Sequence, residues 1–261
     1  MPPTVQQPLP WITPEAALPA PEDARREPPY AGLLAAGQDL GPARLHEAYG
    51  KGIFPWFGED EPVLWWSPDP RMVLRTETFR LHASLRKRIQ RGIREGRLHI
   101  CVDQDFERII EHCANQPRIG QASTWIVPPM VEAYKAFHAQ GYVHGISVYW
   151  DKQLIGGLYA VAIGRAVFGE SMFSLAPDAS KMALAALIAI CRREQAPAID
   201  CQQETAHLAF MGASPQPRNQ FLEQLHPLTQ MPAMDWHFDT TTWAQLDARL
   251  GLAAVAGQGV I

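Results

Sequence analysis

Asp200 and Gln202 form a pair that could manage a proton during a reaction. They lie in a short apolar segment, Ala198–Gln202, whose composition predicts a β-strand. Residues two apart in a strand project from the same face, so both side chains could act on one group. The carboxylate can stabilise positive charge on an amine, and the amide can accept a hydrogen bond that orients it. An ordinary polar pair on a sheet surface is the alternative interpretation.

A second candidate set alternates along residues 169–174. Glu170, Met172 and Ser174 share one face of the predicted strand. Methionine beside small residues forms a deformable apolar wall that accepts side chains of different shapes. The carboxylate of Glu170 would attract an ammonium group. Core packing is the alternative role for Met172.

A third set concentrates positive charge. The segment from Arg80 to Arg97 holds seven of the 23 basic residues, and Leu85, Ile89 and Ile93 recur in it at the spacing of one apolar helix stripe. The other face of this predicted helix carries Arg86, Lys87, Arg88, Arg91 and Arg94. Such a face is either simply solvated or binds phosphates, where each cation releases condensed counterions. Because the whole chain has a net charge of −4, this local concentration of positive charge favours phosphate binding.

Composition excludes several classes of protein. The 261 residues are 47% hydrophobic and 19% charged, which is typical of a globular protein and excludes general disorder. The longest uninterrupted apolar run, residues 182–191, is too short to cross a bilayer, and the first thirty residues do not resemble a secretory signal. We therefore expect a cytoplasmic protein without a membrane partner.

Cysteine and histidine spacing argues against a metal. The four cysteines, at positions 101, 113, 191 and 201, include no C-x-x-C pair, and the nine histidines show no H-x-x-x-H or H-E-x-x-H spacing. This pattern predicts reduced thiols rather than a zinc site or a disulfide framework.

The elements that must position these residues divide the chain into four parts. Residues 1–30 hold nine of the 23 prolines and are predicted to be a flexible arm. Residues 31–78 contain a predicted helix over 41–50 and a strand over 72–76, and form a small N-terminal α/β domain. Residues 79–246 form the main domain, and 247–261 a weakly ordered tail.

The main domain is predicted to be α+β with a mixed sheet. A helix over 129–140 precedes three β-rich segments, 143–150, 154–163 and 166–174, and the tight turns between them predict an antiparallel meander. The apolar helix 180–192 should be buried. Its crossover then places strand Ala198–Gln202 parallel to its neighbour in the same sheet. This order of elements is typical of acyltransferase domains.

A series of short motifs follows along the chain. In order, they are Gly32-Leu-Leu-Ala, Tyr49-x-x-Gly-Ile-Phe-Pro-Trp56-Phe, Leu64-Trp-Trp-Ser-Pro-Asp-Pro-Arg71, Thr124-Trp125-Ile126, Gly156-Gly157-Leu-Tyr159, Gly169-Glu170-Ser-Met172-Phe-Ser174, Ala179-Ser-Lys181, Ile199-Asp200-Cys-Gln202, His207-Leu and Gly212-Ala213. Over residues 31–225 they resemble the leucyl/phenylalanyl-tRNA–protein transferase family, and Gly-Glu-Ser-Met-Phe-Ser is a specific signature.

The resemblance implies an activity and its partners. An enzyme of this family moves leucine or phenylalanine from aminoacyl-tRNA to the N-terminal arginine or lysine of a protein, and methionine is a further expected donor for this chain. The transfer marks the protein for N-end-rule degradation. The resemblance also implies a GNAT-like C-terminal domain and no metal or cofactor. We expect the chain to act as a monomer.

The resemblance also assigns site residues. Asp200, Gln202 and Glu170 take the catalytic positions. The aminoacyl pocket positions are Met172, Ser174, Leu158, Val167, Leu187 and Ile199. Aromatic rings stack on unpaired bases, and the positions that line the site of the 3′-terminal adenosine are Trp125, Trp56, Tyr49 and Tyr134. The tRNA backbone would meet the basic helix.

Two departures from the family pattern bear on the donor. Ser147 stands where the family usually has glutamate, and Val167-Phe168 stands where it usually has two phenylalanines. Val167 and Leu187 would enlarge or reshape the aminoacyl pocket.

Two other functions remain open from the residues. A CoA-dependent N-acetyltransferase would share the fold, but residues 174–181 contain a proline and no glycine where a pyrophosphate cradle would lie. A non-catalytic tRNA-binding protein would explain the basic helix and the aromatic residues. It would not explain Asp200, Gln202 and Glu170.

Overall fold

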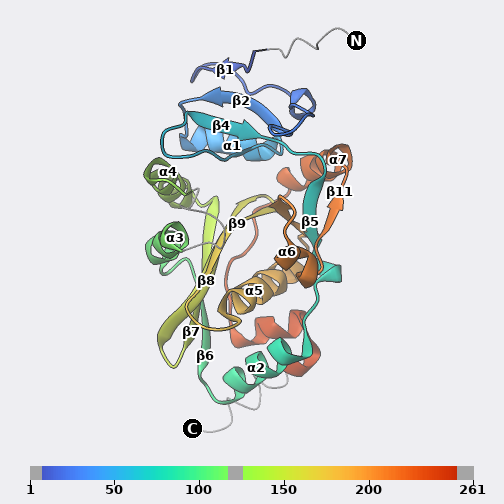
Figure 1. The fold of residues 1–261 in the computed structure, drawn as a ribbon. Helices are drawn as coiled ribbons and strands as arrows, with labels where there is room; N and C mark the ends of the chain where they lie inside the picture. Colours follow the sequence, from blue (N-terminus) through green and yellow to red (C-terminus); the bar gives the residue numbers. More distant parts are fainter. Residues whose placement is uncertain (1–7, 117–125, 252–261) are drawn as a thin grey trace.

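The computed structural model describes residues 8–116 and 126–251 of the chain. Within these ranges the strands form a small four-stranded sheet, in the order β1-β2-β4-β3, and a larger seven-stranded sheet, in the order β11-β5-β10-β9-β8-β7-β6. The two sheets lie at successive levels of the molecule (Figure 1). The predicted α+β fold, with a small N-terminal unit and a larger mixed sheet, is confirmed.

The small sheet is built around one helix. Its strands are β1 (Trp11–Ile12), β2 (Leu33–Gly37), β3 (Phe54–Pro55) and β4 (Val63–Trp66). The predicted helix over 41–50 is confirmed as α1 (Pro42–Gly50). Proline suits the first turn because its φ is already helical and its missing N–H would have no partner there.

Residues 8–30 are packed against the small sheet, so the prediction of a flexible arm is wrong for them. Strand β1 pairs in parallel with β2, the short helix η1 (Pro21–Asp23) follows, and Ile12 and Leu18 are buried. The buried guanidinium of Arg44 in α1 donates hydrogen bonds to the backbone carbonyl oxygens of residues 13, 14 and 16. A proline-rich segment cannot form a full ladder, and Arg44 satisfies its carbonyl groups instead.

The larger sheet begins earlier than the composition suggested. Strand β5 (Arg71–Arg75) pairs with β10 (Ala198–Gln202) on one side and with β11 (Ser214–Gln216) on the other. The short helix η2 (Thr76–Thr78) follows β5. The chain therefore changes sheets between residues 66 and 71, not at residue 78 as predicted. A strand reveals its sheet only through its partners, and β5 and β10 are far apart in the sequence.

The meander predicted over 143–174 is present. Strands β7 (Val143–Trp150), β8 (Gln153–Ile163) and β9 (Ala166–Ser174) pair antiparallel in turn, with β6 (Leu98–Val102) at the edge. Helix α5 (Ala179–Arg193) then crosses over, and β10 lies parallel to β9 as predicted. The remaining helices are α2 (Ala83–Arg94), α3 (Phe106–Asn115), α4 (Pro128–Ala139), α6 (Ala206–Met211), α7 (Arg218–Thr229) and η3 (Thr240–Gln245).

Helices cover both faces of the meander. Helices α3 and α4 lie on one face and α5 on the other (Figure 1). One core accordingly joins the small sheet, α1, α3 and α4, while a second joins α2, α5 and η3. Leu250 is fully buried in the second core, so the predicted weakly ordered tail does not begin at residue 247. Residues 252–261 lie outside the described part of the chain.

None of the helices described here combines the length and the apolar character that crossing a bilayer requires.

Candidate active site

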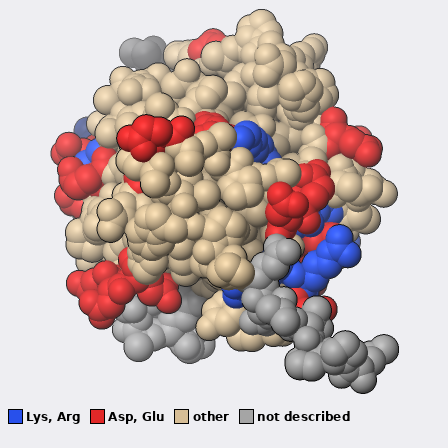
Figure 2. All heavy atoms as spheres, turned by 90° about the horizontal axis from the view of Figure 1, so that it is seen from above, with Lys and Arg blue, Asp and Glu red and all other residues tan. Residues whose placement is uncertain are grey.

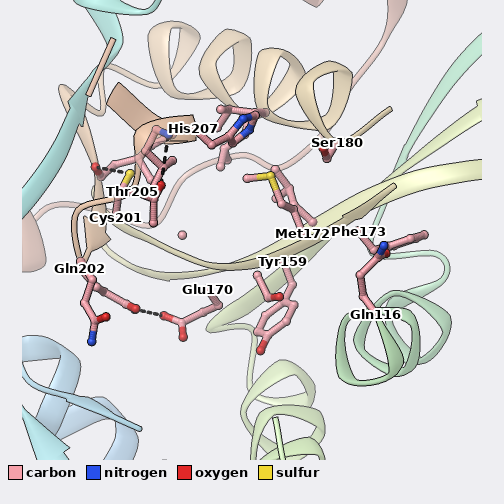
Figure 3. Close-up of a pocket in the computed structure, with 18 of the residues that line it drawn as sticks. Gln116, Tyr159, Glu170, Met172, Phe173, Ser180, Cys201, Gln202, Thr205 and His207 are labelled. Atoms are coloured by element: carbon pink, nitrogen blue, oxygen red, sulfur yellow. Dashed lines mark hydrogen bonds between the residues drawn. The ribbon is translucent and has the colours of Figure 1, made fainter. Parts of the chain in front are cut away.

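A cavity of about 750 Å³ lies where the two sheets meet, beside α5 and α6. Its wall combines the end of β9 and the end of β10 (Figure 3) with strand β3 of the small sheet. The predicted site residues that line it are Glu170, Gln202, Met172, Ser174, Leu158, Leu187, Ile199 and Trp56. The structure thus gathers most of the predicted catalytic and aminoacyl-pocket residues in one place.

Glu170 reaches the cavity through a bulge in β9. Ser171 pairs with Tyr159 and Gly169 with Ala160, so Glu170 is an extra residue between two partners of β8. A bulge redirects a side chain out of the regular alternation. The prediction that Glu170 and Met172 share one face of the strand is therefore wrong. Its carboxylate turns to the α4 side of the sheet, while Met172 packs against the α5 side.

Two side chains hydrogen-bond the carboxylate of Glu170, and Tyr49 is bonded to one of them. Gln202 Nε2 donates to Oε1 at 2.9 Å, and the Tyr134 hydroxyl donates to Oε2 at 2.9 Å. The hydroxyls of Tyr134 and Tyr49 are hydrogen-bonded to each other at 2.5 Å. Figure 3 shows Gln202 and Glu170 pointing toward one another. Burial raises the pKa of Glu170 to about 7, although the tyrosine hydroxyls oppose this shift.

Tyr49 and Tyr134 are fully buried, so the prediction that they line the adenosine site is wrong. Neither ring has a face on which a base could stack. Burial and the nearby carboxylate of Glu170 raise the pKa of both hydroxyls, which therefore stay protonated and act as donors. Aromatic residue type does not reveal burial, and here the hydroxyl groups contribute to the site while the ring faces are enclosed.

Asp200 lies behind the cavity wall, paired with Arg71. Arg71 Nε and Nη2 donate to its two carboxylate oxygens at 2.8 and 2.6 Å, and both side chains are almost fully buried. Asp200 Oδ1 also accepts the backbone N–H of Gln202 at 2.8 Å. Contrary to prediction, the side chains of Asp200 and Gln202 do not share a face. The pairing register shifts between them, and Gln202 has a φ of +62° that turns its side chain toward Glu170.

Arg71 is a buried residue that was not predicted to belong to the site. Its guanidinium lies between the rings of Phe54 and Phe221, 4.9 and 4.7 Å from their centroids, and Nη1 donates to the carbonyl oxygen of Gly52. Arg71 thereby connects the chain leading into β3 to strand β10. Its signals in the sequence are its place at the end of the motif Leu64-Trp-Trp-Ser-Pro-Asp-Pro-Arg71 and a charge directly before the apolar residues of β5.

The apolar part of the wall agrees with the expected aminoacyl pocket at most positions. Leu158, Met172, Leu187 and Ile199 line it, and Ile199 faces the cavity because Asp200 faces away. Ser174 also lines it, and its hydroxyl accepts the N–H of Ser180 near the start of α5.

The two departures from the family pattern lie away from this wall. Val167 is buried in the second core and does not line the cavity, so its predicted role in the pocket is wrong. Ser147 is buried in β7 and is likewise absent from the wall.

Other parts of the wall differ from expectation. Trp56 lines the cavity beside Trp66, whose indole N–H donates to the Trp56 carbonyl oxygen at 2.7 Å. Trp125 lies outside the described residues. The polar wall residues that were not predicted are Gln116, Tyr159, Ser171, Ser180, Cys201, Gln203, Thr205 and His207. Burial and nearby Lys181 lower the pKa of His207, and burial raises that of the Cys201 thiol. Across the described parts of the chain, no cluster of three or more His, Cys, Asp or Glu residues could hold a metal ion.

The basic helix is present as α2, and its apolar stripe of Leu85, Ile89 and Ile93 is buried as predicted. Its outer charges are only partly free. Three of its arginines form ion pairs. The Nη1 atoms of Arg86 and Arg88 lie 3.6 and 3.7 Å from an oxygen of Asp247 and of Asp178, respectively. Arg91 Nε lies 2.9 Å from Glu95 Oε1. Lys87 and Arg94 are exposed and form no ion pair with any residue that the structure describes.

Helix α2 lies at the opposite end of the molecule from the small sheet (Figure 1), and none of its described residues lines the cavity. The face over the small sheet is mostly uncharged, and its acidic groups are more prominent than its basic ones (Figure 2), so the described residues of this face do not form a second basic surface.

Two protein-family models match this chain. A family model described as leucyl/phenylalanyl-tRNA protein transferase matches residues 73–226, and the model of its N-terminal domain matches residues 38–69. This chain belongs to that family. The gap between the two matches falls where the chain passes from the small sheet to the larger one.

Individual relatives match over most of the chain. A leucyl/phenylalanyl-tRNA–protein transferase of Polaromonas sp. is 48% identical over 92% of this chain and 94% of its own. One of Bordetella bronchiseptica is 50% identical over 87% and 91%. A conserved protein of unknown function from Staphylococcus epidermidis, 9% identical, aligns over 71% of this chain and 68% of its own with a TM-score of only 0.37. The GNAT-like assignment therefore stays a prediction.

Proposed function

We propose that this chain transfers leucine or phenylalanine from aminoacyl-tRNA to the N-terminal amine of an acceptor protein. Family membership supports the reaction class, and the Glu170–Gln202 pair at the wall of an apolar cavity is the observation that carries the assignment. The preferred acceptors would begin with arginine or lysine, and their modification would mark them for N-end-rule degradation. Because the cavity walls come from one chain, a monomer is the proposed active unit.

The reaction is aminolysis of an ester, and Glu170 is the proposed proton carrier. The amine nitrogen bonds to the carbonyl carbon, and the bond from that carbon to the ribose oxygen breaks. One proton leaves the nitrogen and one is gained by the departing ribose oxygen, so a single carboxylate can take and return it. A pKa of about 7 suits both steps near neutral pH.

Gln202 is the proposed orienting group for the amine. Its Nε2 donates to Glu170, which fixes the amide so that its carbonyl oxygen can accept a hydrogen bond from the amine. Asp200 and Arg71 are positioning residues. They fix the backbone of Gln202 in its left-handed conformation, which costs energy for a residue other than glycine.

The donor is proposed to occupy the rest of the cavity. The wall of Leu158, Met172, Leu187 and Ile199 would take the leucine or phenylalanine side chain, and flexible methionine would adapt to either. Trp56 would stack on the terminal adenine. The ester bond would then lie beside Glu170 and Gln202.

The decisive assay offers leucyl-tRNA and acetyl-CoA together to an arginine-terminated peptide. We expect leucine on the peptide and no acetylation. Glu170→Gln should lower kcat by roughly 10²–10⁴-fold, whereas Glu223→Gln, an exposed carboxylate on α7, should have no effect. Acetyl transfer would identify a CoA-dependent enzyme. Tight tRNA binding without transfer would identify a non-catalytic tRNA-binding protein, and either result would overturn the proposal.

A further inference from the structure

Phe210 and His82 form a stacked aromatic pair on the surface outside the cavity. Phe210, on α6, is 52% exposed. Its ring lies over the imidazole of His82, with centroids 4.1 Å apart and planes at 12°. His82 Nε2 also donates to the Phe210 carbonyl oxygen at 3.3 Å. A large apolar ring with this exposure, held in a fixed orientation, offers free surface for a flat ligand.

The pair lies between the cavity and the basic helix. His207 and Leu208, on the same short helix, line the cavity, and Phe210 follows His207 by three residues, which places it one turn along on the same side. The end of α6 is fixed against the chain that leads into α2: Arg80 N–H donates to the Met211 carbonyl oxygen at 2.9 Å.

A close backbone approach fixes the same junction. Gly212 approaches Thr78 so closely that a Cβ would lie 2.3 Å from the Thr78 carbonyl oxygen, and His82 directly precedes α2. Figure 1 shows the chain passing α6 on its way from β5 to α2. The aromatic pair therefore has a fixed position on the route from the cavity to the basic helix.

The charges that flank His82 in the sequence favour a nucleic acid over an apolar peptide. Arg80 and Lys87 are exposed on either side of His82 in the sequence, and neither forms an ion pair with a residue that the structure describes. Aromatic rings next to unpaired cations are the combination that binds unpaired nucleotides, because bases stack on the rings and phosphates contact the cations. An apolar peptide would use the ring but not the charges.

We infer that Phe210 and His82 form a stacking site for an unpaired nucleotide just before the terminal adenosine of the tRNA. This inference rests on the proposed function, in which the cavity holds the terminal adenosine. The strand leaving the cavity over α6 meets the aromatic pair before the paired stem reaches α2.

The test compares Phe210→Leu with Phe210→Trp, using leucyl-tRNA and leucyl-adenosine as alternative donors. Phe210→Leu keeps an apolar side chain but removes the ring. It should lower kcat/KM for leucyl-tRNA by roughly 5- to 100-fold, mainly through KM, and leave leucyl-adenosine unaffected. Phe210→Trp should keep both activities. Tyr30→Leu removes an aromatic ring of similar exposure, 49%, from the N-terminal segment and serves as the matched control.

A fluorescence measurement reports stacking directly. A tRNA with 2-aminopurine just before its terminal adenosine should be quenched when it binds the wild-type chain and not when it binds Phe210→Leu. Equal losses of activity with both donors, or a loss that depends only on the acceptor peptide, would overturn the stacking site. A wild-type chain that transfers from neither donor would contradict the proposed function, and quenching would then still test the stacking site.

Discussion

Glu170 has a pKa near 7 because its carboxylate is buried, and this makes its protonation measurable in the enzyme. As a proton carrier it must begin deprotonated, so kcat/KM should rise with pH around a midpoint near 7. The Glu170→Gln variant should lose most of the activity, and its kcat/KM should no longer show this rise. The acceptor's own α-amino group titrates at about 7.7–8.0 and adds a second limb in both proteins.

Protein stability isolates the same group without substrate. A carboxyl group with a higher pKa in the folded state than in the unfolded chain stabilises the fold below about pH 4.3, and that stability is lost as pH rises through about 7. The free energy of unfolding of the wild-type chain, relative to Glu170→Gln, should therefore fall between these values by at most about 1.4 kcal/mol per pH unit. Urea unfolding at several pH values measures this, and parallel curves would contradict the shift.

Replacing Asp200 should mainly lower the stability of the fold, because its partner Arg71 is a buried cation. Asp200→Asn leaves the guanidinium of Arg71 without its counter-charge and should cost about 3–5 kcal/mol. The double variant Arg71→Met with Asp200→Leu removes both charges and should recover much of that stability. Urea unfolding decides between the two outcomes. Unchanged stability in Asp200→Asn would show that the ion pair is not needed for the fold.

Val167 should affect packing and leave donor choice unchanged. Because its side chain lies in the second core, Val167→Phe adds volume to a filled space and should destabilise the chain by about 1–3 kcal/mol. The ratio of kcat/KM for leucyl- and phenylalanyl-tRNA should stay the same. Leu187→Ala, which enlarges the cavity itself, should shift that ratio. A changed ratio in Val167→Phe would show that position 167 lines the aminoacyl pocket.

At the scale of elements, the regular parts of the fold were predictable and the irregular parts were not. Alternation and tight turns indicated the meander, and one uninterrupted apolar run indicated α5. The site depends on the two places where alternation fails, the bulge at Glu170 and the left-handed backbone of Gln202. A bulge is set by the pairing of neighbouring strands, so the residues themselves carry little trace of it.

Contacts distant in sequence were equally hidden. Arg71 and Asp200 are 129 residues apart, and Tyr49 and Tyr134 are 85 apart. The family resemblance, together with their aromatic type, identified both tyrosines as candidates for stacking. Only the packing of α1 against α4 shows that their rings are enclosed. It also shows that the Tyr134 hydroxyl donates to Glu170 and is itself bonded to the Tyr49 hydroxyl.

Helix α2 should contribute to tRNA binding mainly through its unpaired cations. Replacing Lys87 and Arg94 with alanine should lower the slope of log Kd for charged tRNA against log salt by about one for each phosphate that the helix no longer neutralises. Arg91→Ala should have a smaller effect, because that guanidinium is already paired with Glu95. Binding titrations across a salt series measure the slopes. An unchanged slope in the double variant would exclude α2 from the interface.

For the whole molecule, composition misplaced the boundaries while the order of units was right. Proline content suggested an arm, yet Arg44 holds this segment against helix α1 through the carbonyl oxygens of residues 13, 14 and 16. The small unit was predicted to end after β5, but β5 belongs to the larger sheet. Both errors have one cause, since a segment is assigned to a unit by its contacts rather than by its composition.

The cavity is lined by residues of both sheets, with Trp56 from the small unit and Glu170 and Gln202 from the larger sheet. Direct attack of the amine on the ester requires donor and acceptor to occupy this cavity together, so leucine never rests on the protein between them. Initial velocities measured against both substrates should therefore give intersecting lines in a double-reciprocal plot, not parallel ones. Without an acceptor, radiolabelled leucine should not exchange between charged and uncharged tRNA.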